Sequence, residues 1–475
     1  MVGACLSVDI ICPNLFSRKS HVRLINLTPF DINVGALNVK SGSSLDTSSY
    51  SAYNGNVKLF STKDSILVIE RNVGIKNGIS YEFNLPVTVP YVGDIILQIQ
   101  EIGTPTDSIL KMSVRSGSNA SVLKPVVKPW SRNSRDRNSA TFSDGTHTFI
   151  VTYTSFFTGS EDDMWYTIDY IDETNYRVEP VGDDGINLFF YNLYMRGPLN
   201  VFQNGQMQRA KIIPQEITGK FDLLGFCEAF EADARTELLN GLKKYGYSYS
   251  TEIVGSGGVM NGGVIVVSKW PIIKHKVHIF DACAKVDCVS KKGVIYAAID
   301  KNGKKYHIFA THTNASYDTK DDPTRAIRLK QFKEVHVFIK AQKIPKSEPV
   351  IIMGDLNVDM LSNPAEYQEM LHALNASHPP LTGFKYSWDP VTNKLASQTD
   401  LSLRQLLDYI LYSNTHLKPT KSFDKILYFK SHSDWFAKQD LLNRFFDRNT
   451  GAVHTTLFDL SDHYPVYGQF IFSGY

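Results

Sequence analysis

The sequence has few cysteines, little net charge and no long apolar run, and each shortage excludes a class of protein. Five cysteines in 475 residues, at positions 5, 12, 227, 283 and 288, are too few and odd in number for a disulfide framework. No apolar run approaches the roughly 18 to 20 residues with which a helix crosses a bilayer. A net charge of +2 provides no broad basic surface, so we expect no nucleic-acid partner.

The aromatic and apolar content indicates a folded protein with more than one domain. The sequence contains 27 Phe, 24 Tyr and 43% hydrophobic residues, which is too much apolar material for a disordered chain. Its 475 residues exceed what a single hydrophobic core usually serves. We therefore expect two domains.

Two different patterns divide the chain. Residues 22–170 alternate short Val, Ile, Leu and Tyr runs with Ser, Gly and Asn clusters, as strands and turns do. This pattern predicts a β-rich, sandwich-like domain over residues 1–183, whose role the sequence leaves open. From residue 186 onward, apolar runs are separated by helix-like segments, which predicts an α/β (α+β) layered domain over residues 184–475.

Polar residues follow several apolar runs of the second domain, at the points where the predicted strands end. Taken singly, each is more often a cap or a turn residue than a ligand. Together they are informative, because active sites of α/β proteins form at strand ends. The residues concerned are Asn192, Glu228, His312, Asp355 and Asn357.

This set of side chains suits phosphate-ester chemistry with a metal ion. Amide and carboxylate oxygens without a cysteine favour Mg²⁺, with Mn²⁺ or Co²⁺ as substitutes, over zinc. Such an ion neutralises phosphate oxygens while an imidazole moves the proton. His463, beside Asp462, supplies an imidazole, and we expect Asp408 to accept its other ring N–H.

Three motifs in this order resemble the endonuclease/exonuclease/phosphatase superfamily of metal-dependent phosphoesterases: Gly354-Asp-Leu-Asn357, Leu407-Asp-Tyr-Ile410 and Ser461-Asp-His-Tyr-Pro465. Over residues 186–475 the chain more narrowly resembles the bacterial-type neutral sphingomyelinases C. The narrower likeness rests on Tyr191-Asn-Leu-Tyr-Met195, Glu228-Ala-Phe230, the Gly262 to Ile272 segment, Lys292-Gly293, Thr311-His-Thr313, Trp388-Asp389, Thr392-Asn393 and the Asp459 to Val466 segment. The resemblance implies a four-layer β-sandwich flanked by helices, the DNase-like phosphoesterase fold.

The resemblance also implies a role for each matching residue. Glu228 would be the principal Mg²⁺ ligand, His463 the general base, and His312 a group that stabilises the phosphate or assists the leaving group. A buried structural histidine is the alternative for His312. Asn192, Asp355, Asn357 and Asp462 would complete or border the metal centre, and Phe230 would flank the substrate.

The chain departs from the family at a second metal and at a disulfide. Ala232 and Asn261 stand where the sphingomyelinases hold an edge metal, so we expect this metal site to be incomplete. Cys283 matches one half of a family disulfide whose other half is absent after His312. Cys283 and Cys288 either pair locally or remain small buried thiols.

Aromatic residues before the Ser461-Asp-His segment bear on membrane contact. Bacterial members carry an aromatic hairpin there that enters lipid, and this chain has Trp435 and Phe436 in the corresponding stretch. Either these rings dock at a membrane surface or they pack against the sheet. The resemblance favours a secreted or peripheral membrane-associated protein; no clear signal peptide is visible.

These observations together predict a Mg²⁺-dependent sphingomyelin phosphodiesterase of the phospholipase C type, which cleaves sphingomyelin to ceramide and phosphocholine at a sphingomyelin-containing membrane surface. One alternative is another phosphoesterase on the same fold, acting on ceramide phosphoethanolamine, lysophospholipid, inositol phosphate or nucleic acid. A second alternative is a membrane-binding or toxin-like protein led by its N-terminal domain.

Overall fold

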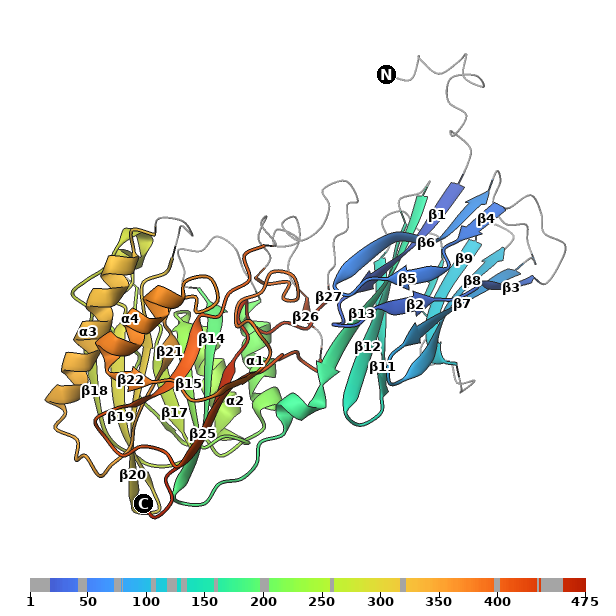
Figure 1. Ribbon diagram of the computed structural model, residues 1–475. Helices are drawn as coiled ribbons and strands as arrows, with labels where there is room; N and C mark the ends of the chain where they lie inside the picture. Colours follow the sequence, from blue (N-terminus) through green and yellow to red (C-terminus); the bar gives the residue numbers. More distant parts are fainter. Residues whose placement is uncertain are drawn as a thin grey trace. The chain divides into compact units, whose positions relative to one another are not determined.

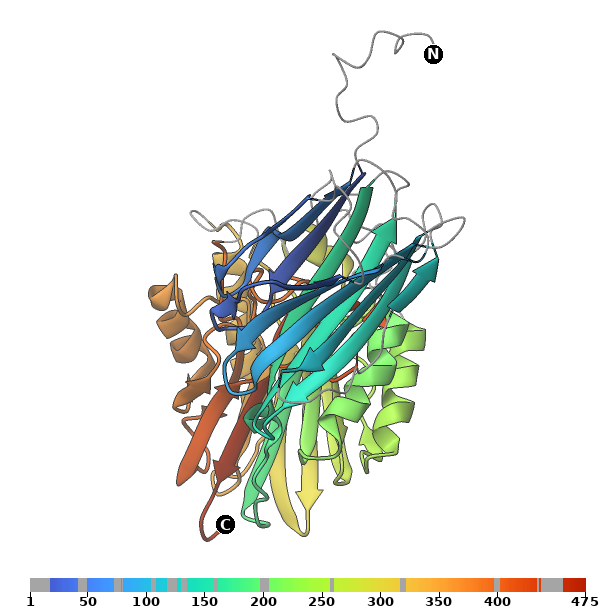
Figure 2. The same ribbon diagram turned by 90° about the vertical axis from the view of Figure 1, so that its right-hand side faces the viewer.

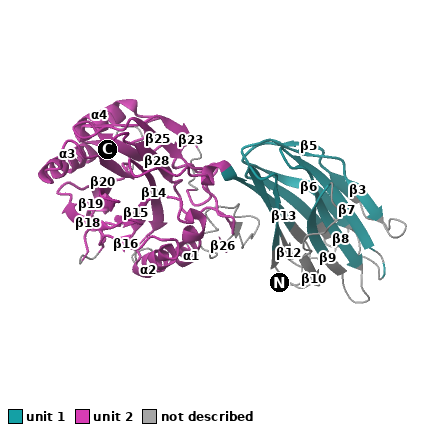
Figure 3. Cartoon of the chain, turned by 90° about the horizontal axis from the view of Figure 1, so that it is seen from below, with its two compact units in different colours: residues 1–173 teal, residues 174–475 magenta. Residues whose placement is uncertain are grey.

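The chain divides into two compact units, Met1–Glu173 and Thr174–Tyr475 (Figure 3). The predicted boundary between residues 183 and 184 falls inside the second unit. Tyr176 lies in this unit, and its hydroxyl accepts a hydrogen bond of 3.0 Å from the Lys430 backbone N–H. The computed structural model describes residues 18–41, 49–71, 78, 80–103, 108–117, 126–129, 135–157, 161–196, 205–256, 260–316, 322–396, 402–433, 435–436 and 456–475.

Unit 1 is a β-sandwich of a 6-stranded sheet, in the order β11-β12-β13-β1-β6-β4, and a 7-stranded sheet, in the order β10-β9-β8-β7-β2-β5 with β3 beside β7 (Figures 1 and 2). Its strands are β1 (Arg18–Asn26), β2 (Ile32–Val34), β3 (Asn38–Ser41), β4 (Ser49–Ala52), β5 (Gly55–Val57), β6 (Ser61–Arg71), β7 (Ser80–Val89), β8 (Gly93–Gly103), β9 (Ser108–Ser116), β10 (Val126–Pro129), β11 (Arg135–Ser143), β12 (His147–Phe157) and β13 (Glu161–Asp172).

The core of unit 1 lies between its two sheets. Along β7, every second side chain from Tyr81 to Val89 is buried, which is the alternation expected of a strand with one face on a core. The Tyr166 hydroxyl on β13 reaches across to the other sheet, where it donates to the Gln98 carbonyl at 2.9 Å. The predicted β-rich region is therefore present.

Unit 2 contains a 7-stranded sheet, in the order β16-β17-β15-β14-β28-β25-β23, and a 6-stranded sheet, in the order β18-β19-β20-β21-β24-β22. Its elements are η1 (Glu173–Tyr176), β14 (Gly185–Met195), α1 (Gln206–Ile217), β15 (Leu223–Ala229), α2 (Ala232–Lys243), β16 (Tyr249–Ser250), β17 (Ile265–Ser268), β18 (Ile272–Ile279), η2 (Lys285–Val289), β19 (Gly293–Lys301), β20 (Lys304–His312), α3 (Arg325–Ala341), β21 (Val350–Asp355), α4 (Pro364–Leu374), β22 (Ala376–Ser377), β23 (Leu381–Gly383), β24 (Asp408–Ser413), β25 (Lys421–Ile426), β26 (Trp435–Phe436), β27 (Thr456–Leu457) and β28 (Val466–Ile471).

The two sheets of unit 2 pack face to face, and the helices cover their outer faces. Helices α1 and α2 lie outside the first sheet, and α3 and α4 lie outside the second (Figures 1 and 3). The central strands β14 and β21 are buried on both faces, as strands between two layers must be. The predicted fold of four layers, with sheets flanked by helices, is confirmed. No helix in the described part of the chain is long and apolar enough to cross a membrane.

Candidate active site

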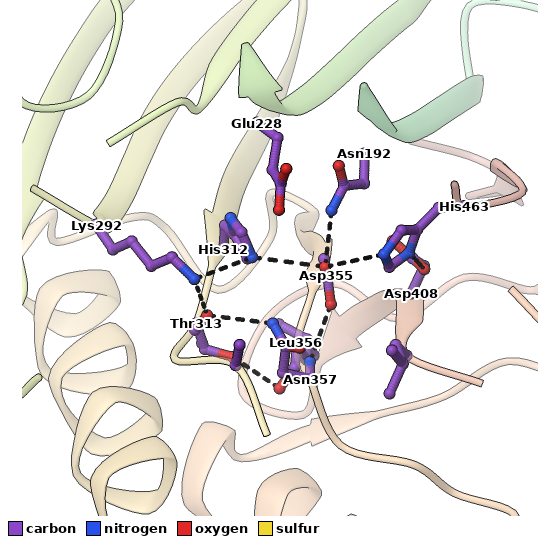
Figure 4. Close-up of polar contacts among 12 residues, drawn as sticks. Asn192, Glu228, Lys292, His312, Thr313, Asp355, Leu356, Asn357, Asp408 and His463 are labelled. Atoms are coloured by element: carbon purple, nitrogen blue, oxygen red, sulfur yellow. Dashed lines mark hydrogen bonds and ion pairs between the residues drawn. The ribbon is translucent and has the colours of Figure 1, made fainter. Parts of the chain in front are cut away.

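The predicted polar residues meet at one edge of the two sheets of unit 2. Strands β14 and β15 run parallel in one sheet, and β20 and β21 run parallel in the other, so the carboxyl ends of each pair lie side by side. Strand β24 runs antiparallel to β21, which places Asp408, its first residue, opposite Asp355. Figure 4 shows the side chains that converge there from both sheets.

Asp408, His463 and Asp355 form the centre of this cluster, with one potential ligand atom from each lying within 4.8 Å of the others. His463 Nδ1 lies 2.8 Å from Asp408 Oδ2, and His463 Nε2 lies 3.8 Å from Asp355 Oδ2. Burial alone would lower the pKa of His463, but the charges of Asp408 and Asp355 raise it to about 10. Burial, and then repulsion from Asp408, raises the pKa of Asp355 to about 7.

Asn192 and Asn357 both contact Asp355. The Asn192 side chain donates to Asp355 Oδ2 at 3.0 Å, and the Asn357 backbone N–H donates to Asp355 Oδ1 at 3.1 Å. Asn357 has a left-handed backbone, with φ at 51°. A left-handed backbone is uncommon at residues other than glycine, and asparagine adopts it more readily than most. Asp355 is thus fixed by a side-chain amide from strand β14 and by a backbone N–H two residues further along its own chain segment.

Glu228 approaches the same cluster from the end of β15, again with a left-handed φ of 51°. Figure 4 shows its carboxylate pointing toward Asp355 and His312. Its Oε2 atom is buried and accepts no hydrogen bond from the described residues, and Arg196 Nε is 3.9 Å away. Burying a carboxylate oxygen that accepts no hydrogen bond destabilises the fold unless a cation lies beside it. The donor set therefore fits a hard divalent cation.

Lys292 is a site residue for which the sequence analysis predicted no role. Its buried ammonium lies 3.1 Å from His312 Nε2 and donates to the Thr313 carbonyl at 2.8 Å (Figure 4). It also pairs with Asp287 at 3.0 Å. Burial, and then the Lys292 charge, holds the pKa of His312 well below its usual value. The same Nε2 atom lies 3.5 Å from Asp355 Oδ2, while Nδ1 has no hydrogen-bond partner among the described residues.

Comparison with known proteins identifies the family. The model of the Endonuclease/Exonuclease/phosphatase family matches residues 190–463, which includes every residue of this cluster. The chain belongs to this family. A sphingomyelinase C from Listeria ivanovii is 37% identical over 297 residues, covering 58% of this chain and 84% of the relative. A sphingomyelinase C from Leptospira interrogans is 34% identical over 309 residues and covers 60% of this chain, which spans only 51% of that relative.

Solved structures agree with this family membership. A crystal structure of beta toxin from Staphylococcus aureus with bound magnesium ions has a TM-score of 0.52 and 31% sequence identity to this chain. The similarity covers 60% of this chain and 98% of the toxin. The predicted resemblance to bacterial sphingomyelinases is confirmed, and the chain is a phosphodiesterase hydrolase of the Endonuclease/Exonuclease/phosphatase family.

Asp462 lies beside the cluster of this phosphodiesterase, one residue before His463. Burial raises the pKa of Asp462 to about 6. Arg209, which the sequence analysis did not single out, ties this loop to that of Asn192, because its guanidinium donates to the Leu193 carbonyl at 2.5 Å and to the Leu460 carbonyl at 2.8 Å. Arg209 precedes Ile213 and Ile217 by four and eight residues, so it falls on the apolar face of α1, and this spacing is the sequence signal that could have identified it.

The aromatic residues expected to contact substrate or membrane are largely packed inside. Phe230 is 7% exposed and lies against Gly263, where a Cβ would approach its ring to 2.7 Å. Trp435 is only 3% exposed, and its indole N–H donates to the Asp459 carbonyl at 2.8 Å. Of the two alternatives for Trp435, the structure has the packed one, since the ring is an internal contact of unit 2. The side chain of Phe436 lies outside the described residues.

The two departures from the family have clear structural outcomes. The Asn261 amide is occupied within the chain: its nitrogen donates to the Phe230 carbonyl at 3.1 Å, and its oxygen accepts from the Gly263 N–H at 2.9 Å. Ala232 begins helix α2 and offers no ligand atom. Cys283 and Cys288 form a disulfide, so the local pairing is the alternative that occurs.

Proposed function

We propose that this chain is a Mg²⁺-dependent phospholipase C that hydrolyses sphingomyelin to ceramide and phosphocholine. The observation that carries the proposal is the buried Asp408–His463–Asp355 arrangement, in a chain 37% identical to a protein named sphingomyelinase C. A histidine fixed by one carboxylate and facing a second is suited to activating water beside a cation. The magnesium ions in the structure of the related toxin support the choice of metal.

Glu228, Asn192, Asp355, Asn357 and Asp462 would hold the cation. When bound, it would polarise the phosphate oxygens and offset the negative charge of the carboxylates around it. Glu228 Oε2 supports this assignment, because it accepts no hydrogen bond from the described residues and lies 3.9 Å from Arg196 Nε, which leaves it available as an oxygen ligand.

His463 acts as the general base in this proposal. Its Nδ1–H is held by Asp408, so Nε2 is the atom that takes a proton from the attacking water. Without a cation, the charges of Asp408 and Asp355 raise the pKa of His463; a cation held beside these carboxylates would offset their charge and lower this pKa, which leaves Nε2 able to accept a proton. Asp408 also stabilises the imidazolium that forms. The water attacks phosphorus in line with the departing ceramide oxygen.

His312 acts as a hydrogen-bond donor to the phosphate. Its Nε2 lies between Lys292 Nζ, at 3.1 Å, and Asp355 Oδ2, at 3.5 Å, and its Nδ1 has no partner among the described residues, so these contacts fix the ring beside the cluster. A donor fixed before the reaction stabilises negative charge that develops in the transition state. His312 is thus suited to a phosphate oxygen or to the leaving alkoxide.

Phosphocholine release tests the proposal. The full chain is incubated with sphingomyelin, phosphatidylcholine, ceramide phosphoethanolamine and duplex DNA, each with Mg²⁺ and with EDTA. We expect Mg²⁺-dependent release from sphingomyelin above the other substrates. Cleavage of DNA or of another phosphate ester without sphingomyelin turnover would overturn the proposed substrate. The assignment of the chain as a phosphodiesterase would stand. Because sphingomyelin lies in bilayers, we also propose that the chain acts as a secreted or peripheral protein at a membrane surface.

A further inference from the structure

The loop between β18 and β19 presents apolar side chains to solvent at the active-site edge. Its 3₁₀ helix η2, Lys285–Val289, contains no buried residue. Val286 is 67% exposed and Val289 is 50% exposed. A helical turn usually buries its apolar side chains, so this turn contributes nothing apolar to the core of unit 2. We call residues 281–291 the η2 loop.

Polar contacts and a disulfide, rather than core packing, hold the η2 loop in place. Cys283 and Cys288 bridge its two sides. The Asp287 carboxylate accepts from the Ala315 N–H at 2.7 Å, and the Ala284 N–H donates to the Asn314 side chain at 2.8 Å. The polar side of the loop is therefore fixed to unit 2, which leaves Val286 and Val289 on its outer side.

The η2 loop borders the catalytic cluster directly. Asp287 Oδ1 pairs with Lys292 Nζ at 3.0 Å, and the same nitrogen lies 3.1 Å from His312 Nε2 (Figure 4). The loop ends where β19 begins, next to the carboxyl end of β20 that carries His312. The two valines therefore lie on a loop that is joined to the catalytic cluster through Asp287 and Lys292.

The charges of the η2 loop fit a phospholipid headgroup layer. Lys285 and Lys291 flank the two valines and are exposed, with one exposed acidic residue, Asp281, at the start of the loop. Apolar side chains flanked by lysines are typical of segments that bind at the membrane interface, where ammonium groups meet lipid phosphates. A protein partner would not require lysines placed to meet phosphate groups, whereas a phospholipid surface would.

We infer that the η2 loop is a membrane-docking element, with Val286 and Val289 entering the headgroup region of the bilayer that holds the substrate. The inference rests on the proposed function, because it assigns the surface by which the same site reaches a lipid substrate. It places the membrane contact on a disulfide-bridged turn, away from the buried Trp435.

The test compares a double aspartate variant with a matched control. Val286→Asp together with Val289→Asp puts two charges on the docking surface, and Val337→Asp puts one on the outer face of α3, where the valine is 64% exposed. Binding to sphingomyelin/phosphatidylcholine vesicles is measured by co-sedimentation in EDTA, so that no substrate is consumed. Hydrolysis of a water-soluble phosphocholine ester is measured separately with Mg²⁺.

We expect the double variant to bind vesicles at least about tenfold more weakly, since burying each valine contributes roughly a tenfold preference for the membrane. Its turnover of the soluble ester and its melting temperature should match those of the wild type, and Val337→Asp should change neither readout. Unchanged vesicle binding by the double variant would overturn the inference, as would an equal loss in Val337→Asp. Weak binding with unchanged hydrolysis of the soluble ester by the double variant supports it.

A second double variant distinguishes a loss of membrane docking from a loss of folding. Val286→Ser with Val289→Ser removes the apolar surface without adding charge, and we expect an intermediate loss of vesicle binding. If the wild type binds vesicles through these valines but hydrolyses neither sphingomyelin nor the soluble ester, the proposed function fails while the docking surface stands.

Discussion

Nδ1 of His463 lies 2.8 Å from Oδ2 of Asp408, although the two residues belong to different sheets of unit 2. Asp408 begins β24 in one sheet, and His463 precedes β28 in the other. The hydrogen bond therefore spans the sandwich at its active-site edge. It depends on the packing of both sheets, so any change in their separation would alter the orientation of the imidazole.

Asp408→Asn should lower kcat about 10²-fold or more, because an amide neither orients the His463 N–H correctly nor stabilises the imidazolium. The measurement is steady-state phosphodiesterase kinetics with Mg²⁺. Asp424→Asn is a matched control, since Asp424 is an equally buried carboxylate that contacts His378 at 2.9 Å outside the site. This control should reduce stability while leaving the kcat of folded enzyme close to that of the wild type; equal kcat losses in both variants would contradict the assignment.

Glu228→Gln should make the melting temperature of the protein less dependent on Mg²⁺. The wild type carries a buried carboxylate oxygen without a hydrogen-bond donor among the described residues, so its melting temperature should rise when Mg²⁺ is added. The amide removes the charge, which should raise stability in EDTA and weaken Mg²⁺ affinity at least about tenfold. Thermal unfolding against Mg²⁺ concentration measures both effects. Glu216→Gln, at a buried carboxylate that pairs with His432, should retain the Mg²⁺ response.

The sequence predicted the layered fold, because buried strands are visible as apolar runs. It also predicted the sheet edge at which the site residues meet, because a polar residue follows several of these runs. It did not predict a role for Lys292. Lys291 and Lys292 are adjacent and look alike in sequence, yet one is exposed and the other is buried beside His312. Only strand register decides which of two neighbouring side chains points inward.

Trp435 shows a second limit of sequence-based prediction. An indole is equally suited to a membrane interface and to a core, because it combines a large apolar surface with one N–H donor. What decides its position is the Asp459 carbonyl that accepts this N–H and the absence of a Cβ at Gly205, where the ring packs. Both contacts join segments far apart in the sequence, and no local pattern reports them.

Lys292→Met should destabilise unit 2 by about 1 to 3 kcal/mol, because it removes the ammonium that pairs with the Asp287 carboxylate, which is 12% exposed. It also removes the donor to the Thr313 carbonyl and the ammonium that contacts His312 Nε2. We expect kcat to fall at least about tenfold, with partial recovery in Lys292→Arg, which restores the charge. Chemical denaturation and kinetics measure the two effects, and Lys291→Met is the control at the neighbouring exposed position. Wild-type stability and turnover in Lys292→Met would contradict this role.

A pH-dependent contribution to stability is expected in unit 1, at the turn between β11 and β12. Backbone and side-chain hydrogen bonds from His147, and the backbone N–H of Thr146, lower the pKa of Asp144 from 3.8 to about 2. A carboxyl group whose pKa is lower in the folded state stabilises the fold above its unfolded pKa. This contribution should be complete above pH 3.8 and should disappear as the pH falls toward 2. NMR titration of the Asp144 carboxyl carbon measures the pKa directly. In Asp144→Ala, unfolding between these pH values should depend less steeply on pH than in the wild type, and an unchanged slope would show that the turn does not hold the carboxylate.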